Sequence, residues 1–305
     1  MTFIDLFCGI GVFRLALEKY GHNCVFSSDI DNNAKTAYSN NFKELPSGDI
    51  TQIKNADIPK HDILCAGFPC QPFSISGKQL SDNDPRGKLF FEIVRIAEFY
   101  KPKILLLENV KNILTIDNGS MLKTIVSELN RIGYRFSYSV LNSSYFGIPQ
   151  KRERVYFVAI KKDLNINYTE PNPTKENIFL DDVLEKNADN AINRNDIKIT
   201  KQDFEIQKSL EPIRVGTVNK GGQGERIYSI KGHAITQSAY GGGVGARTGL
   251  YRTVDDVRRL TLTECKRVMG FPDSHIVSNG LEGYKQLGNA VIPKMVSVVY
   301  EGLNI

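Results

Sequence analysis

The chain has few of the residues that build metal centres and covalent cross-links. Its 305 residues include five cysteines and four histidines. No two cysteines form a C-x-x-C pair, and no His/Cys spacing matches a zinc site. The sequence therefore predicts neither a metal site nor a disulfide framework, and it indicates a reducing compartment such as the cytoplasm.

Long apolar runs are also missing. No stretch approaches the length of a membrane span, and the first residues lack the basic and apolar regions of an export signal. The sequence contains no internal repeat and no low-complexity tail. We expect a soluble protein that is not exported.

Charge and length set only broad limits. The net charge of +5 and the pI near 8.8 fit a polyanionic partner, but many proteins that never meet nucleic acid carry as much positive charge. A chain of 305 residues can form one large domain with a smaller one inserted.

The first half of the chain alternates between two kinds of pattern. Short β-rich runs lie at residues 3–7, 24–28, 63–66, 104–107, 138–141 and 155–160. Between them, apolar residues spaced three and four apart lie at 12–19, 33–40, 89–100 and 121–132. This alternation predicts a doubly wound α/β fold with helices on both faces of a sheet.

The composition changes after the segment Pro171-Asn172-Pro173. Residues 174–210 are polar and rich in Asn, Lys and Asp, and glycines then cluster between 221 and 243. Short strands joined by glycine loops are expected here, in a smaller, mostly β domain whose loops carry its function. Helical spacing returns at 261–269 and 293–303.

Three polar motifs adjoin predicted strands. FPCQPFS at 68–74 follows the apolar run 62–67, Glu108-Asn109-Val110 follows 104–107, and QKRER at 150–154 precedes 155–158. They supply a thiol, a carboxyl and paired guanidiniums at strand ends, where open α/β sheets place their chemistry. Taken singly, each motif also has a purely structural interpretation. The thiol could be a buried packing residue, the carboxyl an acid at a helix N-terminus, and the guanidiniums part of a surface salt-bridge cluster.

Together the motifs resemble those of the DNA cytosine-C5 methyltransferase family. The resemblance implies a mixed, Rossmann-like sheet and transfer of a methyl group from S-adenosylmethionine to a flipped-out cytosine in double-stranded DNA, with S-adenosylhomocysteine as product. It also implies a catalytic and cofactor-binding domain at 1–172 plus 285–305 and a target-recognition domain at 173–284. We expect a monomer that acts without metal in the bacterial cytosol, on the nucleoid.

The resemblance assigns the catalytic roles. Cytosine C5 is a poor nucleophile until a thiolate adds at C6, and Cys70 is placed for that addition. Glu108, kept protonated by burial, would bind N3 and stabilise the developing charge. Arg154 would hold the cytosine O2, and Arg152 would bind nearby backbone or phosphate.

A glycine-containing turn and an acidic residue indicate a nucleotide cofactor. Phe7-Cys8-Gly9-Ile10-Gly11 joins the first predicted strand to the first helix, and Asp29 ends the second strand. This spacing alone also permits a nicotinamide cofactor. The resemblance implies S-adenosylmethionine and these binding residues: Phe7, Gly9, Gly11, Asp29, Ile30, Asp49, Ile50, Pro69, Leu89, Asn289 and Val291.

Two residues depart from the family pattern at the cofactor pocket. Val12 stands where a further glycine is common, and Ile30 stands where close relatives often stack an aromatic ring on the adenine. The chain contains no tryptophan. An aliphatic side chain can still cover one ring face by dispersion, so we expect weaker cofactor binding rather than none.

The remaining motifs indicate DNA recognition. Ser74 and Ser76 lie in a long polar segment that looks like a loop closing over DNA. In the glycine-rich region, Gln223 could occupy the vacated base position, Arg226 could read a guanine, and Tyr240 could pack nearby. Residues 220–226 and 234–243 resemble the recognition region of GCGC-specific members of the family. We expect methylation at GCGC within a restriction–modification system.

Other functions fit part of the pattern. A DNA-binding protein that has lost catalysis would keep the recognition region, whereas a tRNA cytosine-C5 methyltransferase would keep the chemistry. The complete catalytic motifs argue against the first, and the glycine-rich region 212–251 argues against the second. A nicotinamide oxidoreductase is supported only by the nucleotide-binding pattern.

Overall fold

The protein is described from a computed structural model that places residues 1–69, 88–186, 188, 190–202, 206–254 and 256–305. The chain divides into two compact units. The first comprises Met1–Leu141, Glu153–Pro171 and Val296–Ile305, and the second comprises Asn142–Arg152 and Asn172–Met295. The sequence predicted boundaries at 172/173 and 284/285. The assignment of catalysis to one part and recognition to the other stays a prediction.

A six-stranded sheet forms the centre of the first unit, with strand order β2-β1-β3-β4-β6-β5. The strands are β1 (Thr2–Leu6), β2 (Asn23–Ser28), β3 (Ile63–Gly67), β4 (Ile104–Val110), β5 (Tyr134–Asn142) and β6 (Glu153–Lys161). β1 pairs in parallel with β2 and β3, and β3 with β4, whereas β4 pairs antiparallel with β6. The predicted α/β class with a mixed sheet is confirmed.

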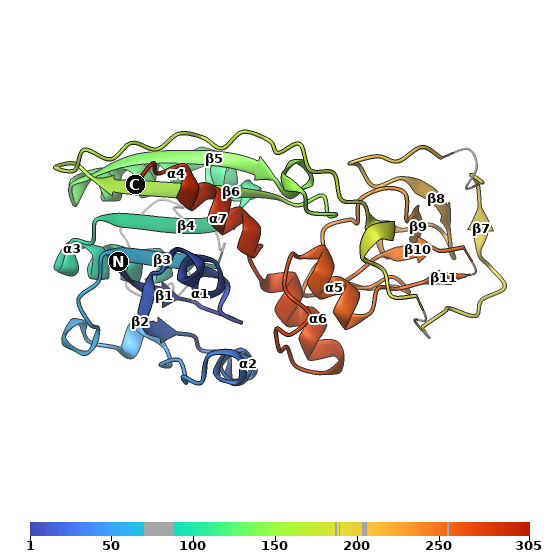
Figure 1. Cartoon of the computed structure of the whole chain (residues 1–305), viewed down its shortest axis with the longest axis horizontal. Helices are drawn as coiled ribbons and strands as arrows, with labels where there is room; N and C mark the ends of the chain where they lie inside the picture. The colour runs from blue at the N-terminus through green and yellow to red at the C-terminus, as the bar shows by residue number, and fades with distance from the viewer. Residues whose placement is uncertain (70–87, 187, 189, 203–205, 255) are drawn as a thin grey trace. The chain divides into compact units, whose positions relative to one another are not determined.

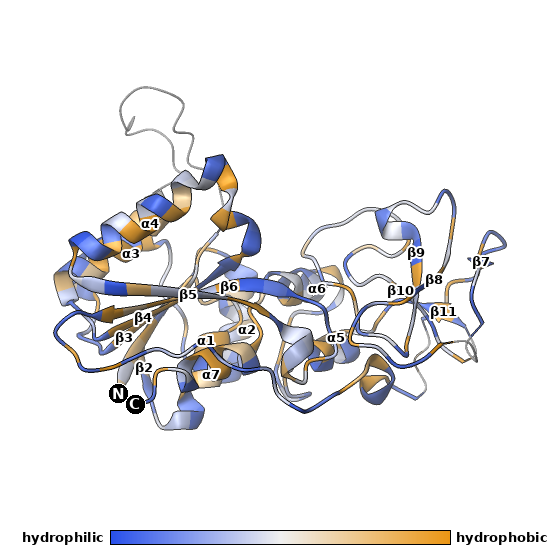
Figure 2. Ribbon diagram, turned by 90° about the horizontal axis from the view of Figure 1, so that it is seen from above, coloured by the Kyte–Doolittle hydropathy of each residue, from blue (hydrophilic) through white to orange (hydrophobic). Residues whose placement is uncertain are grey.

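Helices cover both faces of this sheet, as Figure 2 shows. They are α1 (Val12–Leu17), α2 (Asn32–Phe42), α3 (Lys88–Tyr100), α4 (Ser120–Arg131) and α7 (Pro293–Glu301). α3 and α4 lie on one face, and α1 with the end of α7 lies on the other (Figures 1 and 2). Successive side chains of a strand point to opposite faces of the sheet. Ile4, Leu64 and Leu105 lie in one buried cluster with residues of α3 and α4.

The strand order creates a switch point between β1 and β3. The chain leaves β1 toward β2 and then returns across β1 to form β3 and β4 on its other side. Ligands of open α/β sheets bind at such a point, outside the carboxyl ends of the strands. The turn after β1, Asp29 after β2 and Pro69 after β3 all lie at this edge.

Several strands differ in extent from the sequence prediction, and two of the differences concern β4 and the end of β1. β4 continues to Val110 because its antiparallel pairing with β6 continues, so Glu108 lies opposite Tyr156 inside the ladder. Phe7, expected as the last residue of the first strand, instead lies in the turn with φ of 55°. Both changes concern residues at the candidate site.

The second unit contains a five-stranded sheet with order β11-β10-β9-β8-β7. Its strands are β7 (Lys198–Ile199), β8 (Arg214–Thr217), β9 (Arg226–Ser229), β10 (Leu250–Arg252) and β11 (Val257–Arg258). Its helices are α5 (Leu262–Val268) and α6 (Gly280–Asn289). A small apolar cluster that includes Val215, Ile227 and Leu250 forms the core of this sheet.

Helix α6 is not predicted by the sequence pattern. Its ten residues include three glycines, which lower helix propensity and hide the apolar spacing. Packing explains one of them: a Cβ added at Gly288 would lie 2.3 Å from the backbone nitrogen of Ala239. The tertiary contact therefore requires a residue that the local propensity disfavours.

Short 3-10 segments connect the main elements: η1 (Glu18–Tyr20), η2 (Ile50–Gln52), η3 (Asn55–Asp57), η4 (Lys111–Leu114), η5 (Ile116–Gly119), η6 (Ser143–Phe146), η7 (Leu180–Val183) and η9 (Gln223–Glu225). Within the ranges that the structure describes, no helix is both long and apolar enough to cross a bilayer.

Candidate active site

Asn109 ties the ends of two central strands together. Its side chain is 2% exposed, and Nδ2 donates to the carbonyl oxygen of Phe68 at 2.8 Å. Its Oδ1 accepts from the backbone N–H of Val110 at 2.9 Å. The amide thus fixes the backbone that leads from β3 into the FPC motif relative to the carboxyl end of β4.

Glu108 and Arg154 form an ion pair at the same end of the sheet. Arg154 Nε lies 3.2 Å from Glu108 Oε1, and the two side chains are 15% and 10% exposed. The register of β4 and β6 explains the contact, because Arg154 lies opposite Val110, two residues from Glu108 along the strand. Diagonal neighbours on antiparallel strands lie within reach of long side chains.

Burial and charge act on Glu108 in opposite directions. The buried position disfavours a carboxylate, whereas the guanidinium of Arg154 stabilises it. The role of Glu108 as a protonated donor stays a prediction.

Arg152 is held differently from Arg154. It is 3% exposed, and its Nη1 donates to the carbonyl of Gln237 at 2.9 Å. Its Nη2 donates to the carbonyls of Gly288 and Ala290 at 3.0 and 2.8 Å. All four residues belong to the second unit, and the contacts favour the backbone-binding half of the expectation for Arg152.

The sequence-predicted nucleophile Cys70 lies outside the described residues, as do Ser74 and Ser76. Pro69, the last placed residue before them, is exposed. Cys65 lies on β3 and is 0% exposed, and burial raises the pKa of its thiol well above the ordinary value. Cys65 therefore has the properties of a packing residue, whose thiol stays protonated.

Two glycines in the turn after β1 have left-handed backbone conformations. Gly9 and Gly11 have φ of 54° and 86°, in the left-handed region that glycine adopts without strain. A Cβ at Gly11 would lie 2.2 Å from the ring of Phe42, whereas one at Gly9 would meet nothing within 4 Å. Gly11 thus serves packing, and Gly9 leaves room beside the backbone.

Asp29 is fixed against this turn. Gly9 N donates to Asp29 Oδ2 and Asp31 N donates to Asp29 Oδ1, both at 2.8 Å. Burial raises the pKa of Asp29, and the backbone hydrogen bonds from Asp31 and Gly9 offset part of that rise. The sheet therefore holds an acceptor carboxyl next to the open side of Gly9.

The other cofactor candidates differ in exposure. Ile30 is 73% exposed, which leaves its apolar surface open beside Asp29. Asp49 accepts from Thr51 N at 3.0 Å, so one carboxylate oxygen caps a turn. Ile50 is 3% exposed and lies in the main core cluster, against which Leu89 packs. Asn289 is exposed, Val291 is 7% exposed, and both belong to the second unit.

The recognition candidates lie around β9 in the second unit. Gln223 is exposed and Tyr240 is 70% exposed. Arg226 makes no ion pair with any residue that the structure places, and its Nε is buried without a hydrogen-bond partner. A buried donor without a partner is rare in folded proteins and calls for an explanation.

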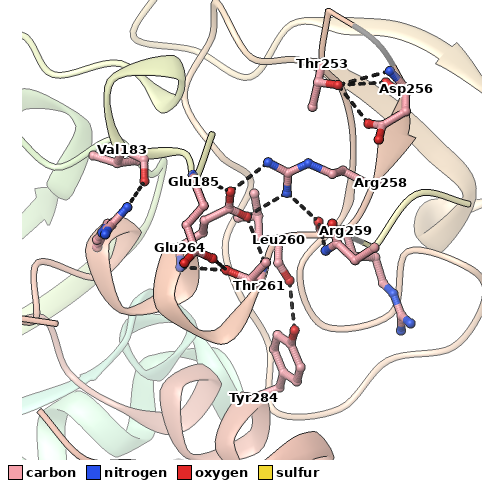
Figure 3. A network of polar contacts seen from close by, with 12 residues as sticks. Val183, Glu185, Thr253, Asp256, Arg258, Arg259, Leu260, Thr261, Glu264 and Tyr284 are labelled. Carbon is pink, nitrogen blue, oxygen red and sulfur yellow. Dashed lines mark hydrogen bonds and ion pairs between the residues drawn. The ribbon is translucent and has the colours of Figure 1, made fainter. Parts of the chain in front are cut away.

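Figure 3 shows a polar network in the second unit that joins β11 to the start of α5. Arg258 Nη1 and Nη2 donate to the two carboxylate oxygens of Glu264, each at 2.7 Å. The backbone N–H groups of Glu185 and Thr261 donate to the same carboxylate at 2.9 and 2.8 Å. The carboxylate of Glu264 is thus surrounded by donors from three segments of the chain.

The placed part of the chain offers no evident metal site. No group of three or more His, Cys, Asp or Glu side chains gathers among the residues that the structure describes.

Comparison with known families decides the identity of this arrangement. Residues 1–304 match the family described as C-5 cytosine-specific DNA methylase. The chain belongs to this family. The predicted resemblance is confirmed, and the protein is a C5 cytosine DNA methyltransferase.

Several curated members of the family align along almost the whole chain. The Type II methyltransferase M.HhaI of Haemophilus parahaemolyticus is 49% identical over 98% of this chain and 93% of its own length. M.HaeII of Haemophilus aegyptius is 40% identical over 97% of this chain and 90% of its own length. M.MspI of a Moraxella species is 38% identical, with coverage of 99% and 70%.

Solved structures share the fold at lower identity. The Dnmt2 methyltransferase of S. pombe superposes with a TM-score of 0.76 at 22% identity, and each chain is covered completely. The Entamoeba histolytica methyltransferase EhMeth gives 0.76 at 22% identity, with coverage of 99% of this chain and 97% of the other. At this identity the likeness shows the methyltransferase fold alone.

Proposed function

We propose that this methyltransferase transfers the methyl group of S-adenosylmethionine to a cytosine flipped out of double-stranded DNA, through a transient bond between Cys70 and C6. The observation that carries the proposal is the Glu108–Arg154 pair at the carboxyl end of β4, with Asn109 holding the Phe68 carbonyl beside it. A carboxyl and a guanidinium thus flank the backbone that leads to Cys70.

The pair suits the charge that develops during addition. When the Cys70 sulfur bonds to C6, the C5–C6 π electrons move into the ring and charge grows toward N3 and O2. Glu108 can donate a proton at N3 as that charge appears, and Arg154 can donate to O2. Since Arg154 already contacts Glu108, one residue can hold the carboxyl in place and bind the base.

Once C5 has accepted the methyl group, the C5 proton leaves to solvent and the Cys70–C6 bond breaks. That elimination restores the aromatic ring, returns the thiolate and gives the N3 proton back to Glu108. No side chain in the motifs stands out as the base, so water is the proposed acceptor.

The residues after β1 and β2 fit S-adenosylmethionine, whose sulfonium supplies the electrophilic methyl group. Asp29 presents a carboxyl beside the open position at Gly9, as binding of ribose hydroxyls requires. A Cβ at Gly48 would likewise meet nothing within 4 Å, which leaves room next to Asp49 for the adenine amino group. Ile30, exposed beside Asp29, would cover one face of the ring.

The remaining cofactor candidates would act mainly through packing. Phe7 and Leu89 are partly buried against the core and can present one side to the adenosine. Ile50 is almost entirely inside the core, so only its edge could touch a ligand. Pro69 is proposed as a further cofactor residue of the first unit, and Asn289 and Val291 are proposed as cofactor residues from the resemblance of their motif to that of the family.

Arg152 is proposed to position the strand that carries Arg154. Its two Nη atoms already make three hydrogen bonds to carbonyl groups, and the side chain is 3% exposed, so a phosphate is a poor competitor. Arg152 would thus influence methyl transfer through Arg154 rather than through DNA.

Recognition of GCGC is proposed for the glycine-rich part of the second unit. Arg226 would read a guanine through two hydrogen bonds, Gln223 would fill the vacated base position, and Tyr240 would pack beside it. The 49% identity to M.HhaI across the chain and the buried, unbonded Nε of Arg226 support this assignment. Ser74 and Ser76 would contact DNA near the extruded base.

A trapping experiment tests the covalent step. The full-length protein is incubated with S-adenosylmethionine and a duplex carrying 5-fluorocytosine at the target position, and adducts are mapped by mass spectrometry. We expect a stable adduct at Cys70 and none with Cys70→Ala. Cys24→Ala is the matched control, since Cys24 is a buried thiol on β2, and it should keep both adduct and turnover. An active protein without an adduct would overturn the mechanism.

Bisulfite sequencing of mixed-sequence duplex DNA tests the site. We expect methylation of cytosine within GCGC. Methylation at another sequence would overturn GCGC alone, methylation of tRNA but not DNA would favour the RNA alternative, and specific binding without methyl transfer would identify an inactive DNA-binding protein.

A further inference from the structure

The segment ahead of β7 carries a charged pair that no motif explains. Arg194 donates from Nε and Nη2 to the two carboxylate oxygens of Asp196, at 2.8 and 2.9 Å. The side chains are 35% and 38% exposed. An isolated pair at the surface contributes little to stability, so the contacts beyond the pair are informative.

Asn219 connects this pair to the loop that precedes β9. Its Oδ1 accepts from Arg194 Nη2 at 2.6 Å, and its backbone N–H donates to Asp196 Oδ2 at 2.9 Å. Its Nδ2 donates to Glu225 Oε1 at 2.8 Å. Asn219 has φ of 45°, a left-handed conformation that Asn tolerates better than most residues, so the backbone turns where the side chain is needed.

Glu225 closes the loop from its other end. Its Oε2 accepts from Gly222 N at 2.9 Å, and its carbonyl accepts from Val218 N at 2.8 Å. The hydrogen bonds from Asn219 and from the backbone of Gly222 lower the pKa of Glu225. The carboxylate of Glu225, the residue directly before Arg226, therefore points back toward the loop 219–225 and accepts hydrogen bonds there.

A second glycine loop rests on the first. Gly245 N donates to the carbonyl of Gly224 at 2.8 Å. A Cβ on Gly224 would lie 2.1 Å from the carbonyl oxygen of Gly242, so the two backbones touch where a side chain would separate them. Tyr240 stands at the start of the second loop, and Arg226 follows the first. Both recognition candidates thus adjoin one pair of loops in contact. We call the hydrogen bonds that Arg194, Asp196 and Asn219 make to one another and to Glu225 the brace of these loops.

We infer that Asn219, held by Arg194 and Asp196, is a positioning residue that sets the sequence specificity of methyl transfer. The inference rests on the proposed role of this region in reading DNA. Glycine loops sample many conformations, and a loop that can rearrange can also adapt to a wrong base. A loop that is already fixed before DNA binds cannot rearrange to fit a wrong base. A mismatched site is therefore bound with less favourable free energy.

The test replaces Asn219 with glycine. Asn219→Gly keeps the left-handed backbone accessible and deletes both side-chain hydrogen bonds. Asn118→Gly is the matched control, because Asn118 is exposed in the first unit at φ of 55° and its side chain makes no hydrogen bond to a placed residue. Steady-state methylation is measured on the site found by bisulfite sequencing and on duplexes that differ from it by one base.

For Asn219→Gly we expect the ratio of kcat/KM between cognate and altered sites to fall about tenfold, a change within the range of one base mismatch. KM for cognate DNA should rise, while kcat at saturation stays close to wild type. Asn118→Gly should leave all three values unchanged. Adding Asp196→Ala to Asn219→Gly should lower the ratio little further, because both changes release the same brace.

The outcomes separate this inference from the proposed function. If the wild-type protein methylates no DNA sequence selectively, the proposed function fails before the variant is made. If the wild type discriminates and Asn219→Gly keeps the ratio, the brace has no role in specificity. A fall in kcat with an unchanged ratio would make Asn219 a general structural residue and would also overturn the inference.

Discussion

One carboxylate–guanidinium pair in each unit has both side chains at most 15% exposed, and these two pairs differ in how closely they are held. In the second unit Glu264 is 0% exposed and receives two hydrogen bonds of 2.7 Å from Arg258 and two more from backbone N–H groups. In the first unit Arg154 Nε approaches Glu108 only to 3.2 Å, at the end of a strand.

The difference separates a pair that holds structure from a pair that suits chemistry. A buried carboxylate whose oxygens all accept hydrogen bonds from the protein cannot bind a ligand as well. Removing one partner of the ion pair leaves the other charge buried and uncompensated. A carboxyl with a longer ion-pair contact at the carboxyl edge of the sheet can exchange that contact for a substrate. Mutations should therefore affect stability in one place and rate in the other.

The largest effect is expected when the second-unit pair loses one partner. Glu264→Ala leaves the buried Arg258 guanidinium uncompensated and should lower the free energy of unfolding by about 3–5 kcal/mol, measured by urea denaturation. The double variant Arg258→Met/Glu264→Leu removes both charges and should be more stable than the single variant. If the single variant is the more stable, the pair is not structural.

A loss of rate is expected when Glu108 changes. Glu108→Gln keeps the size of the side chain but cannot supply an acidic proton at N3, so single-turnover methyl transfer should fall by about 10²–10³. Its free energy of unfolding should fall far less than that of Glu264→Ala. A near wild-type rate would remove Glu108 from the mechanism.

A smaller effect on stability is expected at the cap of α5. Thr261 Oγ1 accepts from Glu264 N at 3.1 Å, and Thr261→Ala should cost about 1 kcal/mol of unfolding free energy. Thr261→Ser keeps the hydroxyl and is the control. Equal losses in both variants would mean that the methyl group, and not the cap, matters.

The smallest effect is expected for an exposed pair near the catalytic one. Lys111 Nζ lies 3.2 Å from Glu153 Oε1, with side chains 54% and 44% exposed. Glu153→Gln should change the unfolding free energy by less than about 1 kcal/mol and leave the methylation rate unchanged. A large loss of rate would show that charge near Arg154 matters beyond its contact with Glu108.

Much of the first unit could be predicted because its signals are local. The runs at 104–107 and 155–160 are apolar on both faces, which is typical of strands covered by helices on both sides. The ends of those strands were less predictable. Glu108 lies inside β4 because β6 pairs with it, and no local pattern near Glu108 contains that information.

The second unit could be predicted less well. Glycine obscured α6, where close packing and not propensity selects the residue. The brace around Asn219 gave no signal because Arg194 and Asp196 lie in a polar stretch without periodicity. A positive charge followed two residues later by a negative one is too common to be informative on its own.

The sequence by itself determined the order of strands and helices in the first unit and the positions of the chemical motifs along the chain, because period and turn chemistry act over a few residues. Tertiary structure alone decided which groups each guanidinium contacts. Arg152 and Arg154 are two residues apart, yet Arg152 binds Gly288, 136 residues away, and Arg154 meets Glu108. Such pairings follow from strand register and from the packing of distant segments, which no short-range rule constrains.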